Sequence, residues 1–375
     1  MLRDYKLILG GVNVDIVIGK PWTPKVEDLI EKFRPAVQNA MLTNNGPLLR
    51  EFEDRLQRMW GVKNVIAVSN GTMAIQLALR GLGAEPGEVI TTAYTWHATI
   101  TAIIYEGHTP VMCDIDESSL CIDPEEVEKR ITDKTVAIVP VNVYGNPPNF
   151  DALEKISQKT GIPVIYDAAH AAFTEYNGKN SFSYGMMSTT SFHATKLINT
   201  CEGGACITDD DDFAEKIRSL RYFGFLPDGK ISDIGTNAKL TELGAAYGLC
   251  CLDSIDTILS KRSAIAEEYS DKISSMEGVK SLAYNSELFT PNNLYFPILS
   301  SSYSHAERIM QEMGKNGIIC RRYFHPSMSE IEAFGQWDCP TSEYYSERVI
   351  CLPIHTSMGD GDVQRVISVL GGVSN

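Results

Sequence analysis

The chain has 375 residues, of which 43% are hydrophobic, and its formal net charge at pH 7 is −15. This length allows a large core and a further, smaller domain, because single hydrophobic cores stop growing at about 250–300 residues. The acidic balance, without a basic run or an Arg-rich stripe, argues against nucleic acid and against an anionic membrane surface as partner.

The most apolar N-terminal run, residues 7–18, is interrupted by Asn13 and Asp15 and lacks a small-residue cleavage site. We therefore expect neither a signal peptide nor a membrane span, and we expect a cytoplasmic protein. Residues 1–24 hold too little apolar surface to fold alone, so they are predicted to form an N-terminal arm.

The cysteine and histidine patterns argue against disulfides and metals. The nine cysteines are an odd number without a C-x-x-C pair, and the seven histidines include no H-x-x-x-H or H-E-x-x-H pair. Neither a disulfide framework nor a zinc site matches these spacings. We expect no metal, and we expect most cysteines to be small buried side chains in a reducing compartment.

Between residues 60 and 210, short Val- and Ile-rich runs recur between helix-like segments: "NVIAVSN", "GEVITTAY", "TPVMCDI", "TVAIVPVNVYG", "IPVIYDAA" and "GGACITD". Each run is nearly unbroken in hydrophobicity and ends in small or polar residues. This pattern is typical of strands buried on both faces of a mostly parallel sheet with helical crossovers. The fold class is therefore α/β, with a doubly wound domain.

Helices are predicted at residues 72–82, 124–131 and 149–160, the second with Asp123 as N-cap and Pro124 at its first position. Residues 237–276 contain no proline and show helical spacing, which predicts one or two long helices. Beyond them, "NNLYFPILS", a helix at 304–316, "GIICRRYFHP" and "RVICLPIH" predict a smaller α/β unit. We expect a large domain at residues 25–250 and a small C-terminal domain at 251–375.

The turn "SNGT", Ser69 to Thr72, leads a predicted strand directly into an amphipathic helix. Gly71 permits a tight turn, and the helix N-terminus presents free N–H groups and the positive end of the helix dipole, which together can hold a phosphate. The alternative is an ordinary capped turn, because the sequence matches neither of the standard glycine-rich phosphate motifs.

Asp167 ends the run "IPVIYDAAH", at the edge of the sheet where doubly wound folds bind ligands. The small residues Ala168 and Ala169 would let a flat ring approach this carboxylate. A helix N-cap is an equally good reading of Asp167 alone. In the same way, His170 alone could be a structural histidine, and Trp96 alone could be a core residue.

Lys196 follows the strand-like run "STTSFHATK" and precedes "EGGACIT", a predicted turn into the next strand. A desolvated lysine amine forms a Schiff base with an aldehyde, and a carboxylate that faces a pyridine nitrogen keeps that nitrogen protonated. A phosphate turn, a carboxylate and a lysine in this order on one parallel sheet suit pyridoxal 5'-phosphate (PLP) better than a dinucleotide.

The motifs "SNGTMA", "YTWHAT", "YDAAHA", "SFHATK" with "EGGA", and "GTNAKLTELGAA" together resemble the DegT/DnrJ/EryC1/StrS family of PLP-dependent sugar aminotransferases. "LTNNGPLLREFE", "RRYFHP" and "CLPI" extend the resemblance over nearly the whole chain. It implies the fold type I aminotransferase architecture, with a large, doubly wound, mostly parallel seven-stranded sheet domain and a smaller C-terminal α/β domain. It also implies an obligate homodimer with active sites at the subunit interface.

The resemblance implies a role for each motif residue. Lys196 would be the Schiff-base lysine and the acid/base, and Asp167 would pair with the pyridine nitrogen. The other cofactor contacts it implies are Thr72, Met73 and Ser191 at the phosphate, Asn237 of the other subunit also at the phosphate, Trp96 on one face of the ring, and His170 near the ring oxygen. Arg321, Arg322 and Tyr323 are candidates for nucleotide or sugar contacts, or are structural surface residues.

The resemblance further implies that an amino group passes from L-glutamate, through pyridoxamine phosphate, to a nucleotide-linked keto sugar. Relatives with "SFH-x-x-K" resemble enzymes that aminate C4 of 4-keto-6-deoxy sugars, whereas "SF[YF]P[GS]K" is more frequent in enzymes that act at C3. We therefore expect dTDP-4-keto-6-deoxy-D-glucose to become dTDP-4-amino-4,6-dideoxy-D-glucose, a precursor for glycans such as lipopolysaccharide O-antigen.

Other functions remain open from the sequence. They include C3 amination, a UDP- or GDP-linked sugar, and a non-catalytic, ligand-sensing relative. A pyridoxamine-dependent dehydratase is disfavoured because Lys196 is present, and a dinucleotide-dependent oxidoreductase is disfavoured because no G-x-G-x-x-G turn occurs.

Overall fold

The computed structural model describes residues 15–283 and 287–373. Most of the predicted N-terminal arm lies outside these ranges, but Ile16 is described and pairs with Ile318 of the C-terminal unit. Among the described residues, no helix is both long and apolar enough to cross a membrane. All nine cysteines are free, and eight of them are buried, as predicted.

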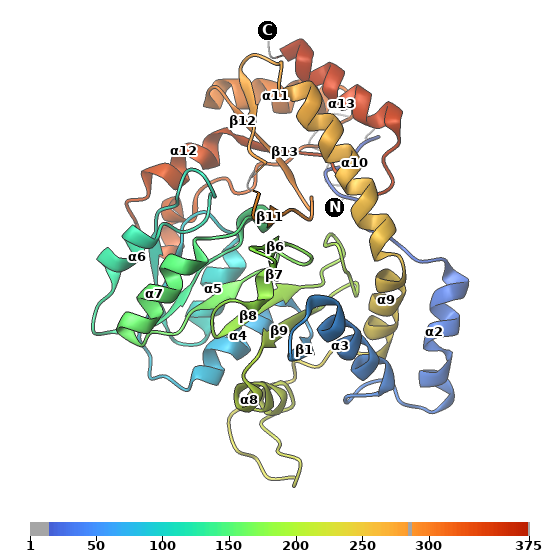
Figure 1. Cartoon of the computed structure of the whole chain (residues 1–375), viewed down its shortest axis with the longest axis vertical. Helices are drawn as coiled ribbons and strands as arrows, with labels where there is room; N and C mark the ends of the chain where they lie inside the picture. Colours follow the sequence, from blue (N-terminus) through green and yellow to red (C-terminus); the bar gives the residue numbers. More distant parts are fainter. Residues whose placement is uncertain (1–14, 284–286, 374–375) are drawn as a thin grey trace.

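A seven-stranded mixed sheet forms the centre of the larger unit (Figure 1). The strand order is β3-β2-β4-β5-β8-β9-β1. The set β3-β2-β4 joins the set β5-β8-β9-β1 through two isolated parallel bridges, Ile138–Val164 and Val141–Asp167. Neighbouring strands run parallel except for β9, which is antiparallel to both β8 and β1. The predicted doubly wound, mostly parallel sheet is confirmed. The strands are β1 (Asn64–Val68), β2 (Glu88–Thr92), β3 (Thr109–Cys113), β4 (Thr135–Val139), β5 (Ile165–Asp167), β8 (Met187–Ser191) and β9 (Gly204–Thr208).

Both faces of this sheet are buried, which explains why its strands read as continuous apolar runs. Along β1, Val65 and Ala67 face one core, whereas Ile66 and Val68 face another. The first core is covered by α2 (Val26–Gln38), α3 (Pro47–Trp60), α6 (Pro124–Arg130), α7 (Phe150–Thr160) and α9 (Glu242–Asp253). The second is covered by α4 (Gly71–Leu82), α5 (His97–Tyr105) and α8 (Asp211–Arg221).

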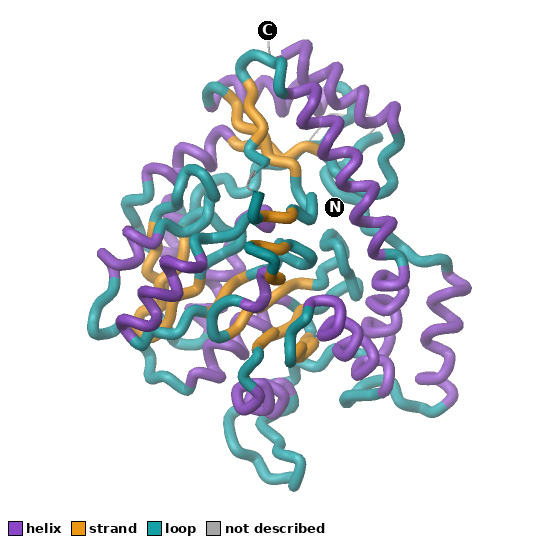
Figure 2. The backbone as a smooth tube through the Cα atoms, viewed as in Figure 1, coloured by secondary structure: helices purple, strands orange, loops and turns teal. Residues whose placement is uncertain are grey.

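The C-terminal unit packs helices against a small antiparallel sheet of order β10-β12-β13. Figure 2 shows this sheet at one end of the molecule, with the long helix α10 (Ile255–Ile273) running toward it from the larger unit. Its other elements are β10 (Val279–Ser281), β12 (Phe296–Ser300), α11 (Tyr303–Lys315), α12 (Pro340–Arg348), β13 (Val349–Leu352) and α13 (Asp360–Val373). A separate small sheet joins β6 (Glu175–Tyr176), β7 (Lys179–Asn180) and β11 (Phe289–Thr290).

The predicted domain boundary at residues 250/251 falls within the last turn of α9. Ile255 and Ile258 at the start of α10 still belong to the core of the larger unit, whereas Ile265 and Tyr269 belong to the core of the C-terminal unit. We therefore propose that the division between the two units lies inside α10.

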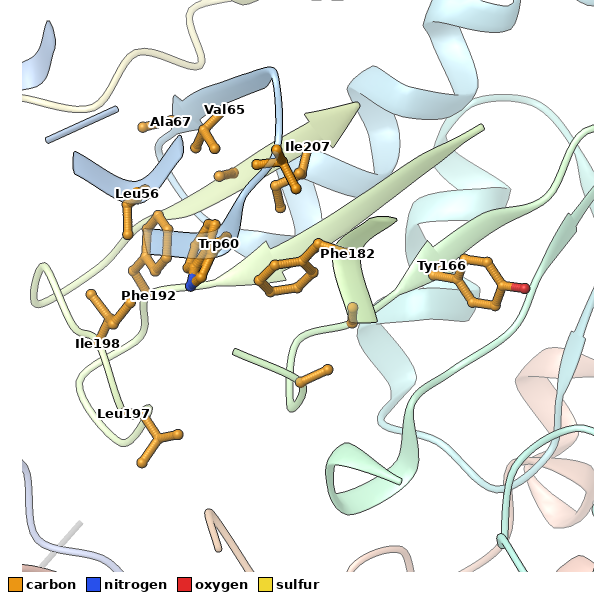
Figure 3. Packing of buried hydrophobic residues seen from close by; sticks show 14 of the residues in the cluster. Leu56, Trp60, Val65, Ala67, Tyr166, Phe182, Phe192, Leu197, Ile198 and Ile207 are labelled. Carbon is orange, nitrogen blue, oxygen red and sulfur yellow. The ribbon is translucent and has the colours of Figure 1, made fainter. Parts of the chain in front are cut away.

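An aromatic cluster in the larger core supports the end of β8 (Figure 3). The Trp60 ring lies 4.6 Å from that of Phe182, and the Phe52 ring lies 5.4 Å from that of Phe192, as measured between ring centroids. Phe192 directly follows β8 and is fully buried. The core therefore fixes the backbone where β8 leads into the loop that carries Lys196.

Candidate active site

Two predicted site residues lie where neighbouring parallel strands end. Asp167 is the last residue of β5 and Ser191 is the last residue of β8. Because parallel strands end at the same edge of a sheet, a ligand at this edge can reach both residues.

Lys196 lies in a short turn after β8 whose flanking side chains are anchored in the core. Its backbone N–H donates to the His193 carbonyl at 2.8 Å. Phe192, Leu197 and Ile198 are buried in the same cluster (Figure 3). These apolar anchors hold the turn that carries the lysine near the edge of the sheet.

The Lys196 amine is partly buried and has a neutral hydrogen-bond partner. Its Nζ donates to the Tyr295 hydroxyl oxygen at 3.5 Å. Burial lowers the pKa of Lys196 from 10.5 to about 8, although the nearby Asp167 carboxylate favours the charged amine. The neutral, nucleophilic amine is therefore far more populated near neutral pH than it is in an exposed lysine.

The Asp167 carboxylate is buried and accepts two hydrogen bonds. Thr99 Oγ1 donates to Oδ2 at 2.7 Å, and the backbone N–H of Ala169 donates to Oδ1 at 3.2 Å. Burial raises the pKa of Asp167, while these donors and the Lys196 charge oppose the rise. Both donors are neutral, so in the described part of the chain no cation touches the carboxylate. A protonated ring nitrogen would complete this site.

The start of α4 forms a cradle beside Ser191. A Cβ atom added to Gly71 would lie 3.0 Å from Ser191 Cβ, so glycine permits this close approach. Asn70 caps the helix by accepting from the Met73 N–H at 2.8 Å, which commits that N–H within the protein. The first N–H groups of the helix, at Gly71 and Thr72, have no acceptor inside the helix and are suited to an anion.

His170 is buried and held in one tautomer. Its Nδ1 accepts from the Tyr144 N–H at 3.3 Å, so the neutral ring carries its proton on Nε2. Burial, aided by the Lys196 charge, lowers the pKa of His170 well below its usual 6.5. The ring packs edge-on against Tyr295 at 4.8 Å and stacks on Phe324 at 6.1 Å. His170 can therefore act as a neutral donor, and not as an acid.

The Arg321 side chain lies near the aromatic rings of both Trp96 and Tyr323. The Trp96 side chain is 42% exposed. The Arg321 guanidinium lies 5.5 Å from the centre of the Trp96 ring and 4.9 Å from that of Tyr323. These contacts connect two of the three predicted substrate residues to the ring predicted to stack on the cofactor.

Two other predicted residues lie elsewhere. Arg322 forms an ion pair with Glu307 at 2.8 Å and covers the Tyr303 ring, so its charge is used within the C-terminal unit. Asn237 is exposed, and it forms an isolated β-bridge with Tyr222 at the base of a projecting segment after α8 (Figure 1).

Thr99 and Tyr295 complete the site but were not predicted from the sequence. Thr99 lies in the quoted motif "YTWHAT", near the start of α5, and no local feature of that motif indicates that its hydroxyl reaches Asp167. Tyr295 immediately precedes β12, and no local feature of "NNLYFPILS" indicates that it reaches the other unit.

These features fit PLP. The lysine has a lowered pKa, no cation among the described residues touches the buried carboxylate, and the start of α4 lies against the strand end at Ser191. An amine, a carboxylate and a helix N-terminus are groups suited to the aldehyde, the ring nitrogen and the phosphate of this cofactor, respectively. Within residues 15–283 and 287–373, no group of three or more His, Cys, Asp or Glu side chains is placed to hold a metal ion.

Comparisons with known proteins agree with this chemistry. The profile of the DegT/DnrJ/EryC1/StrS aminotransferase family matches residues 24–371. A dTDP-4-amino-4,6-dideoxy-D-glucose transaminase of Shigella dysenteriae is 36% identical over 95% of this chain and 98% of that protein. The crystal structure of DesI with its TDP-sugar product has a TM-score of 0.91 at 33% identity and covers 100% of this chain and 97% of DesI. The PLP form of a putative sugar aminotransferase, Spr1654 of Streptococcus pneumoniae, has a TM-score of 0.89 at 26% identity and covers 97% of this chain and 99% of Spr1654.

Proposed function

We propose a function from one premise: the chain belongs to the DegT/DnrJ/EryC1/StrS aminotransferase family. It is a PLP-dependent aminotransferase with the fold type I architecture. We propose that it moves an amino group from L-glutamate to C4 of dTDP-4-keto-6-deoxy-D-glucose and forms dTDP-4-amino-4,6-dideoxy-D-glucose. The observation that carries the site assignment is a lysine of lowered pKa near a buried carboxylate that touches only neutral donors among the described residues.

Lys196 and Asp167 would hold the reactive parts of PLP. The neutral Lys196 amine would bind the cofactor aldehyde, and Asp167 would pair with the ring nitrogen. When bound, PLP supplies an electron sink for the bonds at the carbon that carries the amine. The desolvated carboxylate gains most from a cationic partner, because it already lies among neutral donors.

Thr72 and Ser191 would hold the phosphate with the first N–H groups of α4, and Trp96 would cover one face of the ring. Met73 would add its side-chain surface only, because its N–H already donates to Asn70. His170 would donate from Nε2 to the ring oxygen, since its Nδ1 is occupied by the Tyr144 N–H.

Lys196 would also move the proton at the substrate carbon. A general base works best when its pKa lies near the operating pH, and burial brings the pKa of Lys196 to about 8. The amine can therefore take a proton from the carbon of the amino donor and return one to the carbon of the acceptor sugar.

The dTDP-linked 4-keto sugar is supported by the names of the relatives and by the motif around Lys196. The Shigella protein is named for a dTDP-4-amino sugar, and DesI was crystallised with a TDP-sugar product. In this chain, the Arg321 guanidinium beside Trp96 offers a cation for the nucleotide-linked sugar. Arg322 is committed to Glu307, so we propose Arg321 and Tyr323 as the substrate contacts. The product would serve deoxyamino sugar synthesis in the cytoplasm, for glycans such as O-antigen.

The exposed segment after α8, residues 222–237, supports a homodimer with shared sites. It exposes apolar side chains next to a cavity of about 750 Å³ that Asn44, Asn45, Phe225 and Lys239 help to line. The exposed residues are Tyr222, Phe223, Phe225, Leu226, Ile231 and Ile234. We propose that this segment packs on a second copy and brings Asn237 to the phosphate of that copy.

A panel of sugars tests the proposal. Purified protein with PLP and glutamate is offered dTDP-, UDP- and GDP-linked 4-keto and 3-keto sugars, and the products are identified by mass and by NMR. We expect the dTDP-linked 4-keto sugar to have the highest kcat/KM and to gain nitrogen at C4, while Lys196→Ala forms no product. Amination at C3, or a clear preference for UDP or GDP, would overturn the substrate assignment and leave the aminotransferase in place.

A further inference from the structure

A segment of the C-terminal unit enters the site and is fixed from two sides. Asn292 Nδ2 donates to the carbonyl oxygens of His170 at 2.7 Å and Ala172 at 2.8 Å, which ties the segment to the larger unit. Arg262 Nη1, from α10, donates to the carbonyls of Asn293 at 3.2 Å and Leu294 at 3.1 Å. Tyr295 follows directly, so its backbone has little freedom.

The Tyr295 ring is also held in one orientation. It packs edge-on against three other rings, with centroids 5.9 Å from Tyr144, 4.8 Å from His170 and 5.2 Å from Tyr323. Edge-on contacts of this kind fix ring direction as well as position. The hydroxyl points at Lys196, whose Nζ lies 3.5 Å away.

From this geometry we propose that Tyr295 is a positioning residue for the proton transfer by Lys196, an inference that rests on the proposed aminotransferase function. A neutral amine has one lone pair, and the amine of a long, flexible lysine rotates freely unless a partner fixes it. An N–H donated to the Tyr295 oxygen restricts the amine to rotations in which the lone pair points away from Tyr295 and is free for the substrate proton.

The state of the Tyr295 hydroxyl agrees with this role. Burial raises the pKa of Tyr295 well above its usual 10, so it remains a neutral hydroxyl over the working pH range. It therefore neither removes the substrate proton nor forms a competing ion pair with the lysine. Its effect is geometric, and it should change the rate of proton transfer without changing the affinity for the amino donor.

The test compares two hydroxyl deletions in the same ring cluster. Tyr295→Phe removes the hydroxyl that faces Lys196. Tyr144→Phe is the matched control, because the Tyr144 hydroxyl bonds to the Tyr94 hydroxyl and the Tyr323 carbonyl and not to Lys196. Each holoenzyme is mixed with glutamate or with 2-deuterated glutamate, and the half-reaction is followed by the change in cofactor absorbance.

We expect Tyr295→Phe to bind PLP as the wild type does, to slow the half-reaction by about 10- to 100-fold, and to enlarge the deuterium isotope effect, with the Kd for glutamate within about twofold. Tyr144→Phe should keep the wild-type isotope effect. The positioning role is overturned if Tyr295→Phe keeps the wild-type rate and isotope effect, or if both variants change alike. A wild-type protein that binds PLP but does not react with glutamate would instead overturn the proposed function, and this inference with it.

Discussion

Two buried sites on the same sheet each hold an acidic and a basic side chain. In one site the two side chains form an ion pair, and in the other, among the described residues, each side chain bonds only to neutral groups. Beside β1, Arg221 Nη1 lies 2.5 Å from Glu53 Oε1 and donates to the Ala67 carbonyl at 2.7 Å. The Ala67 N–H donates to the same Glu53 oxygen at 2.8 Å. In this site the two opposite charges pair with each other, and they also form hydrogen bonds with the backbone N–H and carbonyl of Ala67.

At the ends of β5 and β8, Asp167 and Lys196 are each bonded to neutral groups. Thr99 and Ala169 donate to the carboxylate, and the lysine donates to Tyr295. Burial shifts both pKa values toward the uncharged forms. Two incompletely paired groups of this kind cost stability, and they are typical of a site that a ligand completes. This difference distinguishes the structural ion pair of Glu53 and Arg221 from two groups that we propose to be functional, and the following changes test it.

The largest effect is expected from Asp167→Asn. The amide keeps the shape of the side chain but cannot pair with a protonated ring nitrogen, so kcat should fall by about 10²- to 10⁴-fold. Steady-state rates with saturating glutamate and sugar measure this, and circular dichroism verifies the fold. A variant that keeps more than about a tenth of the activity would show that the carboxylate does not have this role.

Glu53→Gln should act on stability instead. It leaves the Arg221 charge buried without its partner, which costs about 3–5 kcal/mol, while the folded fraction keeps its turnover. Urea unfolding combined with activity per folded molecule separates the two effects. The double variant Glu53→Leu/Arg221→Met is the control, and it should be less destabilised than Glu53→Gln. Loss of turnover in the folded fraction of Glu53→Gln would remove the distinction between the two sites.

Lys196→Met should stabilise the apoprotein by about 1–3 kcal/mol at pH 7. The pKa of Lys196 is about 8 in the folded state against 10.5 for the ordinary amine, so the unfolded chain binds more protons between these values. The free energy of unfolding of the wild-type apoprotein should therefore rise with pH through this window. The difference in unfolding free energy between the variant and the wild type should disappear near pH 10.5. Urea titrations of both apoproteins at several pH values measure this difference. Equal stability at pH 7 would mean that the lysine is not desolvated.

The sequence alone allowed us to predict the position of those site residues that lie at or just after the ends of strands. Buried apolar runs predicted the sheet. Asp167 ends β5 and Lys196 lies shortly after β8, so the parallel topology placed both near one edge. Helix bounds were also close: residues 304–316 were predicted, and α11 spans Tyr303–Lys315.

The remaining parts depend on tertiary contacts. Tyr295 is 99 residues from Lys196, and Thr99 is 68 residues from Asp167, so local patterns carry no signal for either contact. Arg321 and Arg322 show the same limit, because the sequence does not indicate which partner each of these adjacent arginines contacts. One lies beside Trp96 and the other pairs with Glu307.

The most direct test of the central claim is to locate the amine that holds the cofactor. Purified protein is saturated with PLP, reduced with borohydride and digested, and the modified peptide is identified by mass spectrometry. We expect a yellow protein and a single phosphopyridoxyl group on Lys196, within the peptide that contains "SFHATK". A colourless protein that takes up no PLP, or a modification on a different lysine, would contradict the account.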